Sequence, residues 1–110
     1  MTYPELVTQL KSLGLPTTYH HWEVGKVPQL PYIIHFKLSR DSVGADNINY
    51  YLSQPVAIEL YSEHHDFENE ERIESLLTDL GFYYTNDEAI FIESENMMMK
   101  RWEITLMKGK

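Results

Sequence analysis

Cysteine is absent from this chain of 110 residues, and its absence excludes several kinds of chemistry. Without a thiolate there is no cysteine nucleophile, no cysteine-type zinc site and no iron–sulfur ligation. Disulfides are excluded as well, but a chain of this size that is 43% apolar can bury enough surface to fold without them. The composition therefore predicts one globular domain over residues 1–110, and it fits a reducing compartment.

Positive charge is scarce: nine Lys and Arg stand against seventeen Asp and Glu, which gives a formal net charge of −8. Proteins that bind nucleic acid need a basic surface, because binding depends on neutralising phosphates. The only basic clusters are Lys100–Arg101 and the final pair Lys108 and Lys110. We therefore expect no direct recognition of nucleic acid.

Long apolar runs are missing too. No segment approaches the ~18 apolar residues of a membrane span. The opening stretch "MTYPELVTQL" lacks the basic start and apolar centre of a signal peptide. The expectation is a protein made in the cytoplasm that has no membrane partner.

Catalytic and metal-binding motifs are also absent. The five glycines are scattered, with no G-x-S-x-G and no phosphate-binding loop, and no H-E-x-x-H is present. Histidines do occur in adjacent pairs, His20–His21 and His64–His65. Neighbouring side chains of an extended chain point to opposite sides, whereas zinc needs three or four converging ligands. We therefore expect no catalytic residue, no metal site and no cofactor, and we predict that the chain is not an enzyme.

The sequence predicts two helices, one at the start of the chain and one in its second half. Thr2 and Glu5 form a capping box for the first helix, and Gly14 ends it. Asp66 caps the second helix, and Gly81 ends it. Apolar residues recur with helical spacing in both, at Leu6, Leu10 and Leu13 and at Ile73, Leu76, Leu77 and Leu80.

Strands are predicted on both sides of the second helix. Residues 32–39 and 48–63 are rich in aromatic and β-branched side chains, with an irregular connection over 16–31 before them. Pro55 predicts a bulge, a bend or an edge position in the longer of these strands. Residues 82–94 favour a hairpin that turns at Asn86–Asp87, and a last strand begins at Met97.

These elements give the order α-β-β-α-β-β. That order is typical of an α+β fold in which two helices pack on one face of an antiparallel sheet. The residues expected to fill the core are Leu6, Leu10, Leu13, Ile34, Phe36, Ile58, Leu60, Ile73, Leu77, Leu80, Trp102 and Ile104.

The chain is unusually aromatic, with eight Tyr, four Phe and two Trp. Tyr and Trp concentrate where a surface is buried against a partner. Tyr50 and Tyr51 fall on opposite faces of one predicted strand, so one of them would be exposed unless another chain covers it. The run Met97–Met99 favours a core-filling loop, with an adaptable interface as the alternative.

The order of segments resembles the tail-completion or tail-terminator proteins of long-tailed phages and prophages of Gram-positive bacteria. The resemblance lies in "YHHWEVGKVPQLPYIIHFKL", "NINYYLSQPVAIELYSEHHD", a Glu-rich helix and "FYYTNDEAIFIESENMMMKRWEITL". It covers nearly the whole chain, and it is a structural pattern that carries no catalytic signature.

This resemblance implies a virion protein of the tail that forms a homo-oligomeric ring, commonly hexameric, at the head-proximal end of the tail tube. Its partners would be the tail-tube protein and the head-connector protein. Loops on a rigid scaffold commonly carry binding function, so we expect the loops beside the aromatic strands to contact a neighbouring subunit or the tube end. The candidate interface residues are His20, His21, Trp22, Arg40, Asp41, Asp46, Asn47, Tyr50, Tyr51 and Met98.

Two other classes of protein remain open on the sequence alone. One is a non-enzymatic α+β domain that binds a partner outside any phage. The other is a metal protein that uses histidine and carboxylate ligands.

Overall fold

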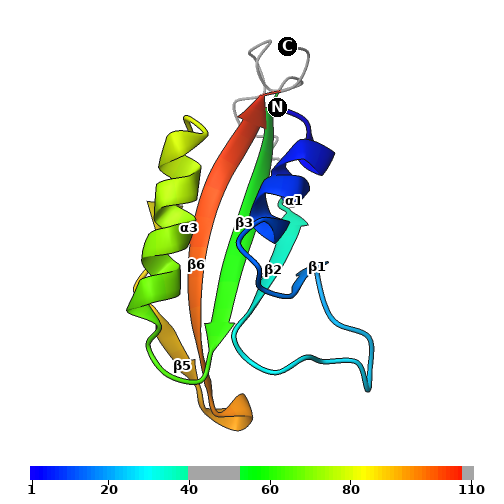
Figure 1. Ribbon diagram of the computed structural model, residues 1–110, viewed down its shortest axis with the longest axis vertical. Coiled ribbons are helices and arrows are strands. Elements are labelled where there is room, and N and C mark those ends of the chain that lie inside the picture. Colours follow the sequence, from blue (N-terminus) through cyan, green and yellow to red (C-terminus); the bar gives the residue numbers. More distant parts are fainter. Residues whose placement is uncertain (40–52, 108–110) are drawn as a thin grey trace.

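The computed structural model describes residues 1–39 and 53–107. Within these ranges two α-helices pack with a twisted mixed sheet (Figure 1). The elements in chain order are α1 (Tyr3–Lys11), β1 (Thr17–Tyr19), β2 (Tyr32–Lys37), β3 (Ser53–Ser62), α3 (Phe67–Asp79), β4 (Thr85–Asn86), β5 (Ile90–Ile92), the 3-10 turn η1 (Glu93–Glu95) and β6 (Met97–Met107).

The sheet has the strand order β1-β2-β3-β6-β4, with β5 also paired to β6. The α+β class and the two helices are as predicted, but the antiparallel sheet is wrong in one pair. Strand β1 runs parallel to β2, with Thr17 opposite Ile33 and Tyr19 opposite His35. The order α-β-β-α-β-β is also incomplete, because β1 forms inside the segment that was expected to be irregular. Over the described residues, three strands precede α3 and three follow it.

Both helices begin as their sequences predict. The Thr2 side chain accepts a hydrogen bond from the Glu5 backbone N–H at 3.2 Å, and the Glu5 carboxylate accepts one from Thr2 N–H at 2.7 Å. Asp66 accepts from the Asn69 N–H at 3.1 Å at the start of α3. Gly81, after α3, has φ +86°, which is the left-handed conformation that glycine adopts without strain. The confirmed caps fix where each helix starts.

The core lies between the two helices and one face of the sheet. Leu6 and Leu10 from α1 and Ile73 and Leu77 from α3 are fully buried in it. The strands contribute alternate residues, as a pleated sheet requires. Those strand residues are Ile33, Val56, Ile58, Leu60, Trp102, Ile104 and Leu106.

The face of strand β2 that meets the helices is the opposite of the one predicted from the sequence. Ile33 lies in the core opposite Leu60, whereas Ile34 and Phe36 lie on the helix-free face of the sheet. Ile34 is still buried, at 8% exposure, and Phe36 is half-buried. The alternation was predicted correctly, but "YIIHF" is apolar in both phases. Its pattern therefore does not decide which phase meets the helices.

Pro55 does not interrupt its strand. The register between β3 and β6 is continuous from Ser53–Met107 to Ser62–Met98, so the bulge is wrong; of the predicted alternatives the structure favours the edge position, because the pairing with β2 ends before Pro55. Strand β2 ends opposite Val56, and the Leu38 N–H donates to the Pro55 carbonyl at 2.9 Å. The ring nitrogen of Pro55, which cannot donate, therefore lies where the neighbouring strand has already ended.

The predicted hairpin within residues 82–94 is also wrong. Strands β4 and β5 do not pair with each other, and both pair antiparallel with β6. Strand β4 lies opposite Trp102 and Glu103, and β5 lies opposite Met97–Met99. The hairpin that does form joins β5 to β6 through η1. It turns at Asn96, which has φ +53°.

Candidate interaction surface

Residues 20–31, here called the arm, connect β1 to β2 and begin by packing on the helix-free face of the sheet. The His20 N–H donates to the His35 carbonyl at 2.8 Å, and the His20 ring meets the Phe36 ring edge-on at 5.6 Å. The Trp22 ring lies edge-on against Tyr32 at 5.5 Å. Trp22, predicted as an interface residue, therefore covers its own sheet, and its ring nitrogen is buried without a hydrogen-bond partner among the described residues.

The arm then leaves the sheet and projects beyond its β1 edge (Figure 1). Val24 is 101% exposed and Val27 is 58% exposed. Lys26 makes an ion pair with Glu23 at 3.6 Å, in which both side chains are 75% exposed. Two apolar side chains and one lysine thus stand in solvent at the tip of the arm.

Beside the arm, Tyr3, Tyr19 and His35 form an aromatic cluster under α1. The Tyr3 hydroxyl and the His35 Nδ1 are hydrogen-bonded at 2.7 Å, and the Tyr19 ring lies edge-on to His35 at 5.7 Å. Burial lowers the pKa of His35, and the nearby Lys11 charge lowers it further. The neutral imidazole is therefore the form that the fold favours.

This burial predicts that stability falls as the pH falls below ~6.5, the ordinary pKa of histidine in an unfolded chain. In that range His35 becomes protonated in the unfolded chain but stays neutral in the folded one. The free energy of unfolding therefore falls until the pH reaches the lowered pKa of folded His35. Denaturant unfolding at several pH values from about 7.5 down to about 5.5 should show this loss. His35→Gln should reduce the slope relative to the control variant His64→Gln, which replaces an exposed histidine in the turn before α3. Equal slopes for both variants would contradict the assignment.

The helix-free face carries a buried carboxylate at its centre. Glu59 is only 8% exposed; it accepts a hydrogen bond from the Tyr61 hydroxyl at 2.7 Å and lies 3.4 Å from the Arg101 Nε. The Arg101 guanidinium also lies 5.4 Å from the centre of the Phe36 ring. Burial, and then the bond to Glu59, raise the pKa of the Tyr61 hydroxyl. These contacts link three strands on this face of the sheet, although the buried Arg101 Nε makes an ion pair with Glu59 and no hydrogen bond among the described residues.

Residues 87–99, here called the β5 hairpin, form the opposite edge of the sheet. Ile90 is 50% exposed and Phe91 is 53% exposed. Phe91 lies directly opposite Met98 on β6, so the two side chains are neighbours on the same face of the sheet, and Met98 is half-buried. The same segment carries four exposed carboxylates, at Asp87, Glu88, Glu93 and Glu95.

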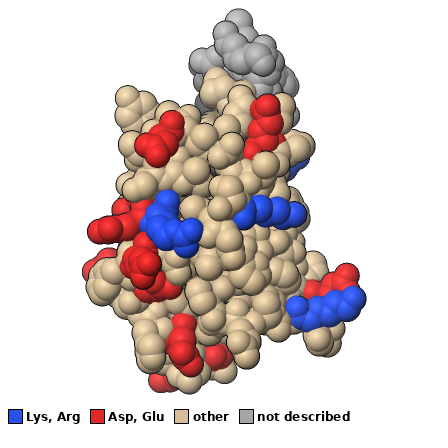
Figure 2. All heavy atoms as spheres, in the orientation of Figure 1, with Lys and Arg blue, Asp and Glu red and all other residues tan. Residues whose placement is uncertain are grey.

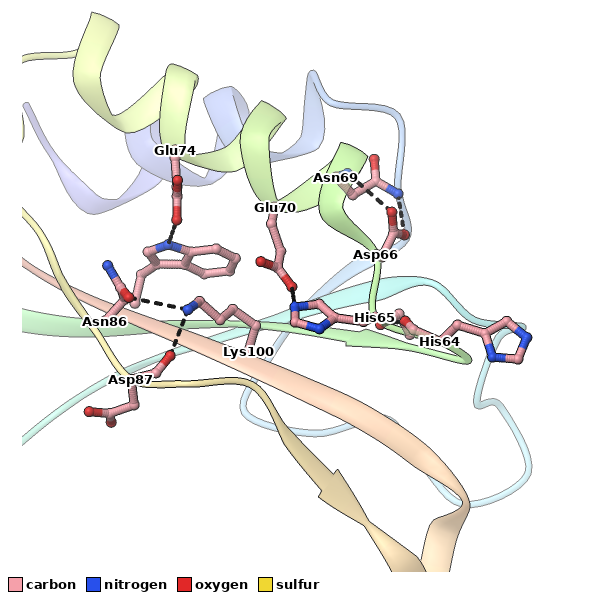
Figure 3. A network of polar contacts seen from close by, with 11 residues as sticks. His64, His65, Asp66, Asn69, Glu70, Glu74, Asn86, Asp87 and Lys100 are labelled. Atoms are coloured by element: carbon pink, nitrogen blue, oxygen red, sulfur yellow. Dashed lines mark hydrogen bonds and ion pairs between the residues drawn. The ribbon is translucent and has the colours of Figure 1, made fainter.

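Polar contacts hold this edge against β6 and α3 (Figure 3). The Lys100 ammonium donates to the Asn86 side chain at 3.1 Å and to the Asp87 carbonyl at 2.7 Å. The Trp102 indole N–H donates to the Glu74 carboxylate on α3 at 3.0 Å. These bonds cross from β6 to the turn before β5 and to the helix. The β5 hairpin is therefore presented on a fixed support.

The second histidine pair lies in the turn before α3. The His65 Nε2 is 2.9 Å from the Glu70 carboxylate, and its ring stacks on Phe67 at 4.0 Å. His64 points away from this contact (Figure 3). In residues 1–39 and 53–107 no three His, Asp or Glu side chains gather as a metal site would require. The described helices include none that is long and apolar enough to cross a membrane.

Charge divides the molecule between its two edges. Residues 1–39, which form α1, β1 and β2, hold three lysines and two glutamates, a balance of +1. Residues 63–95, which form α3, β4 and β5, hold one arginine and eleven Asp and Glu, a balance of −10. In the space-filling view many of the acidic groups gather on the α3 side (Figure 2). The two edges of the sheet therefore differ in electrostatic character.

The predicted interface residues are only partly brought together. His20 and His21 are exposed at the base of the arm, with their Nδ1 atoms 3.0 Å apart, and Met98 lies on the opposite edge. Ile90 and Phe91, which are exposed on the β5 hairpin, were not among the candidates, although "AIFI" is an apolar segment between acidic residues. The remaining candidates, Arg40, Asp41, Asp46, Asn47, Tyr50 and Tyr51, lie outside the described residues.

No protein-family model matches the sequence, and no curated protein matches it.

Proposed function

We propose that this chain is a virion structural protein of a long-tailed phage or prophage. It caps the head-proximal end of the tail tube as a homo-oligomeric ring, ends tube polymerisation and joins the tail to the head connector. It acts by binding its partners and not as an enzyme. The proposal combines the segment order described above with the character of the two sheet edges.

The observation that carries the proposal is that the two edges are open and dissimilar. Among the described residues, β1 pairs only with β2, and β5 pairs only with β6. Unpaired strand edges offer backbone groups to another chain. Because one edge is strongly acidic and the other is not, a head-to-tail contact is favoured over a symmetric one. Head-to-tail contacts between identical chains close into rings when the rotation allows.

An acidic ring also suits the passage of DNA. Carboxylates facing a channel repel phosphates, so DNA passes without sticking to the wall. The acidic excess of residues 63–95 would supply such a lining if α3 or the β5 hairpin faces the channel.

The test is made on virions of a phage that encodes this chain. Deleting the gene should give tails of abnormal length that do not join heads, and the infectious titre should fall by orders of magnitude. Supplying the intact gene from a plasmid should restore both. Antibody labelling should place the protein at the head-proximal end of the tail. Normal tails joined to heads in the deletion strain, or label elsewhere on the particle, would refute the proposal.

A further inference from the structure

We propose that the β5 hairpin of one copy binds the tip of the arm of the next copy. Phe91 would pack against Val24 and Val27, and Lys26 would lie among the acidic side chains of the hairpin. The partner on each surface is a second copy of this chain. The inference rests on the proposed ring, for which it supplies the contact between neighbouring subunits.

Exposed apolar side chains are the first support. Val24 and Val27 at the arm tip are 101% and 58% exposed, and Ile90 and Phe91 on the hairpin are 50% and 53% exposed. Both sets stand on segments that project from the sheet, on its opposite sides (Figure 1). Burying such side chains against each other removes apolar surface from water, which is the main driving force of association.

Charge complementarity is the second support, and it selects the orientation. The hairpin carries Asp87, Glu88, Glu93 and Glu95, all exposed, so two hairpins brought together would repel each other. The arm tip carries Lys26, whose ion pair with Glu23 is largely exposed to solvent. Such a surface pair contributes little, so Lys26 can exchange Glu23 for a carboxylate of the neighbour.

Anchoring on both sides is the third support. Lys100 holds the turn before β5, and β5 is paired with β6, where Phe91 lies beside Met98. At the base of the arm, Trp22 and His20 pack on Tyr32 and Phe36. A contact between supported segments loses less conformational entropy on binding than one between free loops.

The chain has no cysteine, so the contact can be tested by cross-linking introduced thiols. We would make Val27→Cys and Phe91→Cys separately, mix the two variants, and treat them with a short bismaleimide. The expected result is a mixed dimer whose yield exceeds that of the control mixture by about tenfold, which corresponds to ~1.4 kcal/mol of preference. The control mixture pairs Val27→Cys with Tyr83→Cys, which is 97% exposed on the same acidic half but off the hairpin.

Two further experiments test the contact more strictly. A chain that carries both Val27→Cys and Phe91→Cys should give a ladder of oligomers, because each copy joins one neighbour at each end. Adding Lys26→Glu should lower the yield, and Glu93→Lys with Glu95→Lys in the partner should restore it. Higher salt should lower the yield of the original pair, since exposed charges are screened.

Equal yields for the test and control mixtures would overturn the contact. A faster dimer from Phe91→Cys alone would overturn it as well, because it would show a symmetric hairpin-to-hairpin contact. Failure of the proposed function is read separately, on the virion. If cross-linking gives the ladder but antibody labelling places the protein away from the tail end, the contact is supported and the tail role is rejected. Correct labelling without cross-linking would do the reverse.

Discussion

Replacing Trp102 with alanine is expected to lower the free energy of unfolding by about 3–5 kcal/mol. Trp102 is fully buried in the middle of β6, between Ile58 on β3 and Asn86 on β4. Its truncation removes the largest side chain of the core and leaves a cavity that the surrounding strands cannot fill. It also removes the indole N–H that donates to Glu74 on α3. Urea unfolding, followed by circular dichroism, would measure the loss.

Trp102→Phe is the matched control. It keeps an aromatic ring in the core but lacks the N–H, and Glu74 is partly exposed and can turn to water. We expect a smaller loss, about 1–2 kcal/mol, since Trp102→Phe loses one hydrogen bond and part of the packing. If Trp102→Ala cost no more than Trp102→Phe, the indole would not be a central element of the core.

The helices were predictable because local chemistry determines them. A capping box at Thr2, an N-cap at Asp66 and a glycine after each helix are short-range signals. The structure reproduces them as hydrogen bonds and positive φ angles. Spacing of three and four residues then identified Leu6, Leu10, Ile73 and Leu77 as buried.

The sheet was less predictable, because its shortest strands have too few residues to show a period. Strand β1 has three residues and β4 has two, and their pairing depends on what lies beside them in space. The Ile33 N–H, for example, donates to the Pro16 carbonyl at 2.8 Å, a bond that ties the start of β1 to β2. That contact spans seventeen positions in the chain, and no local pattern announces it.

The choice of face in β2 shows a second limit of the sequence. Ile33 and Ile34 are equally apolar, and both are buried, but on opposite sides of the sheet. The helices cover one side, and the start of the arm contributes Trp22 and His20 to the other. A strand that is covered on both faces has apolar residues at consecutive positions, so its sequence does not show which face meets the helices.

The candidate surface was even harder to predict than the sheet, because it depends on which strands lie at the edges. The acidic excess was visible in the composition, but its separation from the lysines of residues 1–39 follows from the strand order β1-β2-β3-β6-β4. That order places the first and later parts of the chain at opposite edges. The contact of Trp22 with Tyr32 was not visible in the sequence either, because it forms only where the arm folds back on its own sheet.

Leu77→Ala is expected to cost about 2–5 kcal/mol, the range for a fully buried leucine. Leu77 has no exposed surface and lies with Ile73 on the face of α3 that meets the sheet. Because α3 is a helix with a strongly polar outer face, its attachment depends on this small set of apolar side chains. Their loss should therefore weaken the packing of the whole helix.

Thr78→Ala, at the next and exposed position, is the control for Leu77→Ala. It changes the helix without touching the core, and we expect a change within about 0.5 kcal/mol in either direction. Amide hydrogen exchange would add a local measurement: in Leu77→Ala the α3 amides should exchange faster relative to those of β3 and β6 than in the parent chain. Equal stability of the two variants would mean that α3 does not pack on the sheet through Leu77. The support for the β5 hairpin through Glu74 and Trp102 would then need another explanation.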